Sequence, residues 1–485
     1  MYQHGRVAHC SPNTKGHFMT NNASQGDESS DSTSQLGHGL KVRHLTMMGL
    51  GSAIGAGLFL GTGVGIKAAG PAVLISYIVA GFLVVLVMRM LGELGAARPN
   101  TGTFSAYSRQ AFGQWAGFST GWLYWFMLVM VMGAEITGAG AFIGNWFGVD
   151  GWIPALVCVI IFTFINMAKV RGFGEFEYWF AFIKVAVIIF FLVVGVLLIF
   201  GLLPGHAMVG FEHVRESGFA PNGVGGIAAG LLAVAFAFGG IEIVTIAAAE
   251  SENPSGAIAT AVRSVILRIS VFYLGSVLVI IFLLPYSTLG QAEGAADSPF
   301  TRVLAQADIP GVVGFMEIII TLALLSAFNA QIYATSRVIY AMSKEGDGLK
   351  FFTKTNHEGV PTRAVCLSMA LAYLSVALQI WGPANLIELF FNIVGGSLLV
   401  LWFMIAASEI KLRPEMEAEG TLPVKMWGYP YMSYVALIGL LALTVLMLFD
   451  NSARPQVIAV GVFFAALVAL SAVARRRNAS AVPAK

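Results

Sequence analysis

Twelve long apolar segments alternate with short polar ones along most of the chain. A helix needs roughly 20 mainly apolar residues to cross the hydrocarbon core of a bilayer, and each segment is about that long. The segments are residues 45–66, 71–92, 117–143, 152–169, 180–203, 224–248, 264–285, 310–342, 363–381, 386–408, 431–449 and 455–474. This pattern predicts an all-α membrane protein with 12 transmembrane helices.

The positive charges test the number of spans. If both termini are cytoplasmic, 24 of the 28 Lys and Arg residues lie in or beside inner segments. The outer segments then hold only Lys67, Arg215, Arg302 and Arg454. Such a bias is typical of multi-pass proteins and sets their orientation. We therefore expect a plasma-membrane protein, with a disordered cytoplasmic tail at 1–38 and a second cytoplasmic tail at 475–485.

The composition narrows the function. Hydrophobic residues make up 57% of the chain and charged residues 11%, and the mean hydropathy is +0.77. Soluble domains are about 45–50% apolar and about 25% charged, so a soluble enzyme is excluded. A net charge of +2 gives no field for a nucleic acid partner. The spans carry isolated charges rather than the continuous polar lining of a channel or a cluster of catalytic or metal-binding residues, so we expect no cofactor and no enzyme activity.

Two of the predicted spans contain helix-breaking sequences. The first has four glycines within nine residues, in GLGSAIGAG at 49–57, and each costs a helix roughly 1 kcal/mol relative to Ala. The sixth contains FGGIE at 238–242, with a carboxylate in mid-span. Interruptions at matching places in two halves of a transporter indicate its binding site, although glycines also serve helix packing. Free N–H groups at such a break suit a carboxylate and free C=O groups suit an ammonium, so two breaks suit a zwitterionic amino acid.

These motifs resemble those of the amino acid–polyamine–organocation superfamily, in its bacterial amino acid permease branch. The resemblance extends over LKVRHLTMMGLGSAIGAGLFLG (40–61), GFGEFEYWFAFIKV (172–185), AAAESENP (247–254) and NAQIYATSR (329–337). It implies a five-plus-five inverted repeat with helices 1 and 6 broken, plus two C-terminal helices. The repeats would be residues 39–210 and 211–425, with the last two spans in 426–474. It also implies proton-coupled uptake of an amino acid, with aromatic amino acid permeases as the most similar subfamily and 4-aminobutyrate permeases as near neighbours.

The breaks and the resemblance together predict the residues of the substrate site. They are Ser52, Ala53, Ile54, Gly55, Ala56, Gly57, Glu135, Phe238, Gly239, Gly240 and Ile241. Phe238 is the gating aromatic residue by resemblance. A permease for 4-aminobutyrate or another neutral amino acid, or an exchanger of the same fold, remains an alternative. The expected partners are the amino acid and the lipid bilayer, and the sequence makes no prediction of oligomeric state.

Ionisable residues inside spans are the candidates for proton coupling or gating, because a charge in the bilayer is costly. Lys184 either carries a proton or extends to the headgroups, and the resemblance places it where other superfamily members bind sodium. Glu135 meets the substrate ammonium, carries a proton, or bonds a neighbouring helix. Glu242 either holds the sixth-span break in place or acts as a gate or proton site, whereas Glu388 is expected at the outer interface.

Charges at the predicted inner face have two interpretations. Glu93, Arg89, Arg98, Glu250 and Glu252 either pair across the inner loops and hold the outward-open state, or are solvated loop charges.

Overall fold

The computed structural model describes most of the chain beyond residue 53. The described residues are 54–100, 104–167, 173–243, 255–258, 260, 262, 268–289, 298–356, 359–383, 385–449, 451 and 453–480. Every regular element within these ranges is a helix. This agrees with the all-α prediction.

Long and short helices follow one another in the first part of the chain. In order they are η1 (Gly57–Gly61), α2 (Thr62–Ala69), η2 (Gly70–Ala72), α3 (Val73–Ala97), α4 (Phe104–Phe112), α5 (Gln114–Phe147), α6 (Trp152–Met167), α7 (Phe173–Ile199), α8 (Glu212–Ser217) and α9 (Gly223–Ala237). The second part is η4 (Arg268–Leu274), α12 (Gly275–Leu283), η5 (Tyr286–Thr288), α13 (Pro299–Ala305), α14 (Val312–Lys344), η7 (Lys350–Thr353), α15 (Thr362–Trp381), α16 (Leu386–Ala418), α17 (Tyr431–Phe449) and α18 (Arg454–Ser480).

Eight helical runs in the described residues are long and apolar enough to cross a membrane. One of them, Gly57–Ala97, contains the end of the first predicted span and all of the second, and Gly70 between them has a positive φ of 64°. Three shorter apolar helices, Trp152–Met167, Gly223–Ala237 and Ile269–Leu283, coincide with further predicted spans. The chain is therefore built from membrane-length helices.

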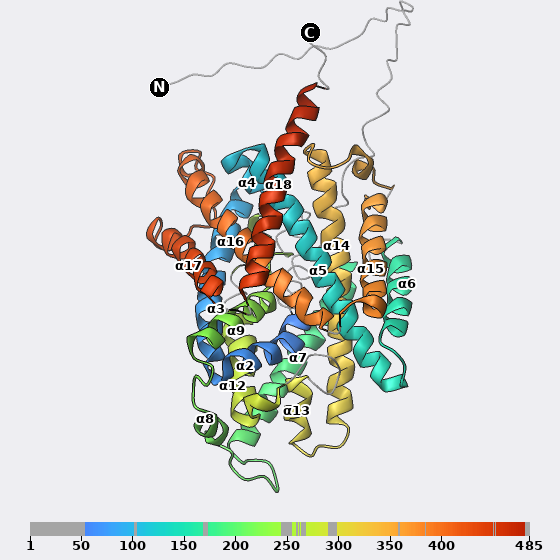
Figure 1. Cartoon of the computed structure of the whole chain (residues 1–485), viewed down its shortest axis with the longest axis vertical. Helices are drawn as coiled ribbons and strands as arrows, with labels where there is room; N and C mark the ends of the chain where they lie inside the picture. Colours follow the sequence, from blue (N-terminus) through green and yellow to red (C-terminus); the bar gives the residue numbers. More distant parts are fainter. Residues whose placement is uncertain are drawn as a thin grey trace, which may run out of the picture.

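The long helices α5, α14 and α18 run along the long axis of the bundle (Figure 1). In this view α8 and α13 lie at one end, and α4 lies with the last turns of α14 at the other. α5 packs against α14, α4 and α16, and α2 packs against α9. α17 and α18 lie at the periphery with many apolar side chains exposed, as expected for helices that face lipid.

Some helix limits differ from the apolar segments. α3 ends at Ala97 and α16 at Ala418, beyond the predicted 92 and 408, because a helix continues through polar residues once it leaves the hydrocarbon region. α7 begins at Phe173 rather than 180. The predicted sixth span, 224–248, is interrupted after Ala237.

Candidate functional site

The sixth predicted span breaks where its glycines lie. α9 ends at Ala237, and turns follow over 238–242 before helical geometry resumes at Ile243. Gly240 has a φ of 88°, a conformation that side chains with a Cβ rarely adopt. The Gly239 N–H donates to the carbonyl of Phe236 at 2.8 Å, which closes the last turn of α9. The predicted interruption at 238–242 is confirmed.

The described part of the first span begins at its break. Ser52 and Ala53 lie outside the described residues, and Ile54 and Ala56 are fully buried. The carbonyl of Gly55 accepts the N–H groups of Leu58 at 3.2 Å and Phe59 at 3.1 Å, so a new helix starts here and continues as η1 and α2.

The two breaks lie against each other. A Cβ added to Gly57 would be 2.7 Å from the Cα of Ala237, so the start of η1 touches the end of α9 through backbone atoms. The structure thus places Gly57 of the first break against Ala237, the residue before Phe238 of the second break. Small residues at both breaks are what permits this approach.

Glu135 of α5 occupies the start of the new helix. Its carboxylate is buried, and both oxygens accept the Ala56 N–H, at 3.1 and 3.0 Å. A Cβ on Gly55 would overlap this carboxylate. Because free N–H groups at a helix start favour a negative charge, Glu135 takes the place that the substrate carboxylate was expected to take. Of its three predicted roles, the described contacts show the bond to a neighbouring helix.

Lys184 of α7 is buried, with 1% of its surface exposed. It does not extend to the headgroups; it interacts electrostatically with Glu177 and Glu135. Glu177 in turn accepts the Ser326 hydroxyl of α14 at 3.0 and 3.1 Å. A buried cluster of two carboxylates and one amine therefore links α5, α7 and α14.

Glu177 was missed by the sequence analysis. It lies within the GFGEFEYWFAFIKV stretch and seven residues before Lys184, a spacing that puts both on one helix face after two turns. That spacing was the available signal. The predicted span began only at 180, so the carboxylate was not considered as buried.

Glu242 holds the sixth-span break. Its buried carboxylate accepts the Gly240 N–H at 3.3 Å, and the Tyr124 hydroxyl of α5 lies close to it. This contact agrees with the first of the two roles proposed for Glu242. Its role as a gate or proton site remains a prediction.

Aromatic rings surround Phe238. Its ring centroid lies 5.9 Å from that of Tyr77, edge-on, and 5.1 Å from that of Tyr273. The Tyr273 hydroxyl donates to the carbonyl of Ala237 at 2.8 Å and the Tyr77 hydroxyl bonds Thr62 at 3.1 Å. The break is thus lined by rings whose polar tips are already engaged, and both tyrosines were missed because a lone Tyr in a span is usually packing.

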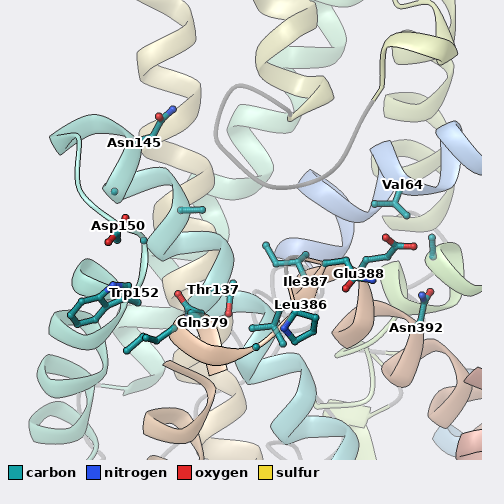
Figure 2. A pocket seen from close by; sticks show the side chains of 18 of the residues that line it. Val64, Thr137, Asn145, Asp150, Trp152, Gln379, Leu386, Ile387, Glu388 and Asn392 are labelled. Atoms are coloured by element: carbon teal, nitrogen blue, oxygen red, sulfur yellow. The ribbon is translucent and has the colours of Figure 1, made fainter. Parts of the chain in front are cut away.

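A cavity of about 1190 Å³ lies beside α2 and α9, the two helices that adjoin the breaks. It is lined by α2, α5, α9, the start of α6 and the turn from α15 to α16, and Figure 2 shows Thr137, Gln379, Glu388 and Asn392 around it. Thr137 is two residues beyond Glu135 on α5. Lys67, Asp150 and Glu388 supply its charges, and Glu388 is exposed as predicted. A cavity of this size admits a small organic molecule.

The comparison with known sequences fits this geometry. A model of the amino acid permeases matches residues 44–479. The chain belongs to the amino acid permease family. It is accordingly a membrane transporter and not an enzyme.

Relatives of this permease have named substrates. It is 63% identical to the aromatic amino acid transport protein AroP of Corynebacterium glutamicum over 90% of this chain and 95% of that protein. It is 38% identical to the gamma-aminobutyric acid permease of Bacillus subtilis over 93% and 96%. It is 34% identical to AroP of Escherichia coli K12 over 85% and 90%.

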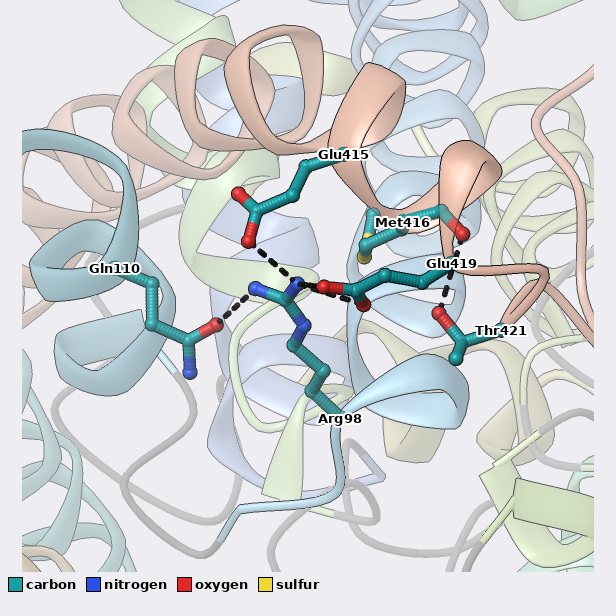
Figure 3. A network of polar contacts seen from close by, with 6 residues as sticks. All are labelled: Arg98, Gln110, Glu415, Met416, Glu419 and Thr421. Atoms are coloured by element: carbon teal, nitrogen blue, oxygen red, sulfur yellow. Dashed lines mark hydrogen bonds and ion pairs between the residues drawn. The ribbon is translucent and has the colours of Figure 1, made fainter.

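The end of the permease opposite the cavity is tied by ion pairs. Arg98, just beyond α3, donates to Gln110 of α4 at 3.2 Å and to Glu415 and Glu419 of α16 at 2.9 Å (Figure 3). Two further arginines make related contacts: Arg109 of α4 pairs with Glu345 and Asp347 beyond α14, and Arg89 bonds the carbonyl of Lys425. Arg98 forms ion pairs with Glu415 and Glu419, so it is not a solvated loop charge. That these contacts hold an outward-open state stays a prediction, and Glu250 and Glu252 lie outside the described residues.

Replacing Arg98 by Ala tests this closure. An exposed ion pair contributes at most about 1 kcal/mol, so we expect roughly two- to fivefold faster alkylation of a cysteine placed at buried Ser108 of α4. The background lacks the three native cysteines. Arg302→Ala, at the other end of the molecule, is the control. Equal alkylation rates in both variants would contradict a closing role for Arg98.

Proposed function

We propose that this permease takes up the aromatic amino acids phenylalanine, tyrosine and tryptophan together with protons. The observation that carries the substrate class is the 63% identity to an aromatic amino acid transport protein over nearly its whole length. The rings of Phe238, Tyr77 and Tyr273 beside the breaks support it, because aromatic side chains pack favourably against an aromatic substrate. The 38% identity to a 4-aminobutyrate permease supports the alternative less well.

The proposed topology follows the sequence. It has 12 spans, repeats over 39–210 and 211–425, two further spans in 426–474, and both termini in the cytoplasm. In this orientation the cavity is the outer vestibule and the Arg98 contacts close the inner face. The described conformation is then outward-open.

The proposed substrate step is an exchange of carboxylates. The α-carboxylate of the amino acid takes the Ala56 N–H that Glu135 now accepts, while Phe238, Gly239, Gly240 and Ile241 border the rest of the molecule. This step is supported by the overlap between the expected position of the substrate carboxylate and the observed position of Glu135. The substrate ammonium compensates the displaced Glu135.

The proposed coupling site is the cluster of Lys184, Glu135 and Glu177. With all three ionised it carries one net negative charge in a buried place, which is unfavourable. One bound proton neutralises it, and we propose that this proton accompanies the substrate. A single charge crossing at 100 mV supplies about 2.3 kcal/mol, enough for a roughly 50-fold gradient.

Uptake into proteoliposomes tests the function. Radiolabelled phenylalanine, tyrosine and tryptophan are supplied with and without an inward proton gradient, and with 4-aminobutyrate as competitor. We expect gradient-driven accumulation of all three that excess 4-aminobutyrate does not reduce. Inhibition by 4-aminobutyrate without aromatic uptake would overturn the substrate class, and uptake that ignores the gradient would overturn proton coupling.

A further inference from the structure

A second buried cluster of acids and a base lies far from the breaks, where α3, α16 and α17 meet. Glu93 of α3 and Glu409 of α16 are fully buried, and Arg413, one turn after Glu409, is 4% exposed. Arg413 donates to one oxygen of Glu93, and so does the N–H of Met426. The cluster joins residues more than 300 positions apart in the sequence.

Glu409 is the unusual member of this cluster. Both its carboxylate oxygens are buried without a hydrogen bond of ordinary geometry from any described residue, and the second oxygen of Glu93 is in the same condition. Ser433 of α17, Glu93 and Arg413 lie close enough to act on Glu409 electrostatically. The Ser433 hydroxyl likewise makes no hydrogen bond of ordinary geometry with any described residue.

Among the other charged groups near the cluster, Arg89 of α3 is only half-buried, bonds the carbonyl of Lys425 and lies over the Trp427 ring. Glu417 approaches Arg413 at 3.7 Å but is more than half exposed. The ring of Tyr429 lies 4.7 Å from the Arg413 guanidinium, and neither Tyr429 nor the nearby Tyr434 supplies a positive charge. The buried groups therefore comprise two carboxylates for one guanidinium.

We propose that Glu93 and Glu409 share one proton and form a second proton-binding site of this permease, separate from the Lys184 cluster. Two carboxylates in one buried site cannot both ionise at low cost. A proton on Glu409 turns one oxygen into a donor for the unbonded oxygen of Glu93, and leaves the other oxygen to accept from Ser433. One proton thus satisfies four unbonded polar atoms and leaves the cluster neutral.

The position of the site gives it a role. α3 packs against α16 and α17 at the cluster, and all three helices also pack against α9, which ends at the sixth-span break. Loss of the proton leaves a net negative charge between them and weakens the contact. Since the site lies near the Arg98 network, a more alkaline cytoplasm favours opening of the inner face. This assignment to the inner face rests on the proposed orientation; the proton site itself does not depend on which amino acid is carried.

The variant Glu409→Gln tests the role, because its amide keeps the shape and neutrality of the protonated acid. Counterflow of phenylalanine is measured in proteoliposomes at fixed external pH, with internal pH varied over about two units. We expect the wild-type rate to change on the order of fivefold and the Glu409→Gln rate to stay nearly constant. Glu216→Gln, on an exposed acid of α8 outside both charge networks, should respond as the wild type does. An unchanged internal pH response in Glu409→Gln would overturn the role.

Infrared spectroscopy of the purified permease tests the proton directly, without any substrate. A protonated buried carboxyl has a carbonyl band that ionised carboxylates lack. We expect the wild type to show this band, and the band to persist in heavy water because the buried proton exchanges slowly. Glu409→Gln and Glu93→Gln should each lose the band, while Glu135→Gln should keep it. A band that stays unchanged in both Glu409→Gln and Glu93→Gln would overturn the proposed proton site. Failure of phenylalanine counterflow with this band present would instead count against the proposed substrate.

Discussion

Replacing Lys184 by Ala is expected to abolish accumulation of substrate against a gradient. The variant leaves Glu135 and Glu177 buried together without their cation, and breaking a buried ionic cluster costs about 3–5 kcal/mol. The two acids then bind protons so tightly that release to the inside no longer follows the gradient. Accumulation is measured as the ratio of internal to external phenylalanine under an inward proton gradient.

Two controls separate coupling from folding. Lys350→Ala removes an exposed lysine and should accumulate as the wild type does. The double variant Lys184→Met with Glu177→Gln keeps the net charge of the ionised cluster at minus one, because it removes one positive and one negative group. We expect it to fold and exchange substrate without accumulating it. Full proton-driven accumulation by Lys184→Ala would reject the coupling role of Lys184.

Gly57→Ala is expected to lower substrate affinity by roughly 5- to 160-fold. Its new methyl group would lie 2.7 Å from the Cα of Ala237, a backbone atom that cannot turn aside. Forcing a methyl group into a packed contact costs about 1–3 kcal/mol, which converts to that range of affinity. Binding of radiolabelled phenylalanine to purified protein measures the effect.

The matched control is Gly461→Ala on α18. A Cβ there meets no atom within 4 Å, so the same substitution should leave affinity unchanged. Wild-type affinity in Gly57→Ala would show that the contact between the two breaks does not shape the binding site.

Hydropathy predicted most helices of this permease, because membrane spans must be apolar over a fixed length. α17 covers Tyr431–Phe449, the limits predicted for its span. The predicted ends of some helices were wrong where contacts outside the bilayer, rather than hydropathy, determine where the helix ends. α16 continues ten residues beyond the predicted end into a polar segment, where Glu415 and the following Glu419 pair with Arg98, a contact that no local pattern reveals.

The breaks were predictable because clustered glycines destabilise a helix, so within a membrane span they indicate either an interruption or close helix packing. The contact between the breaks through Gly57 and Ala237, and the hydrogen bond from the Ala56 N–H to Glu135, were not predictable. Both join residues about 80 to 180 positions apart in the sequence. The partners of buried charges were likewise hidden. Glu93 was placed at the inner face, but its pairing with Arg413 depends on how α3 and α16 pack.

The mouth of the cavity carries charges of both signs, one from Lys67 and two from Asp150 and Glu388. An amino acid with balanced charges feels little net force from such a mouth, and dissolved ions screen what remains beyond about 10 Å. Encounter is therefore governed by diffusion and by the width of the opening. The rate at which such an amino acid meets the cavity is therefore expected to change little with the salt concentration outside.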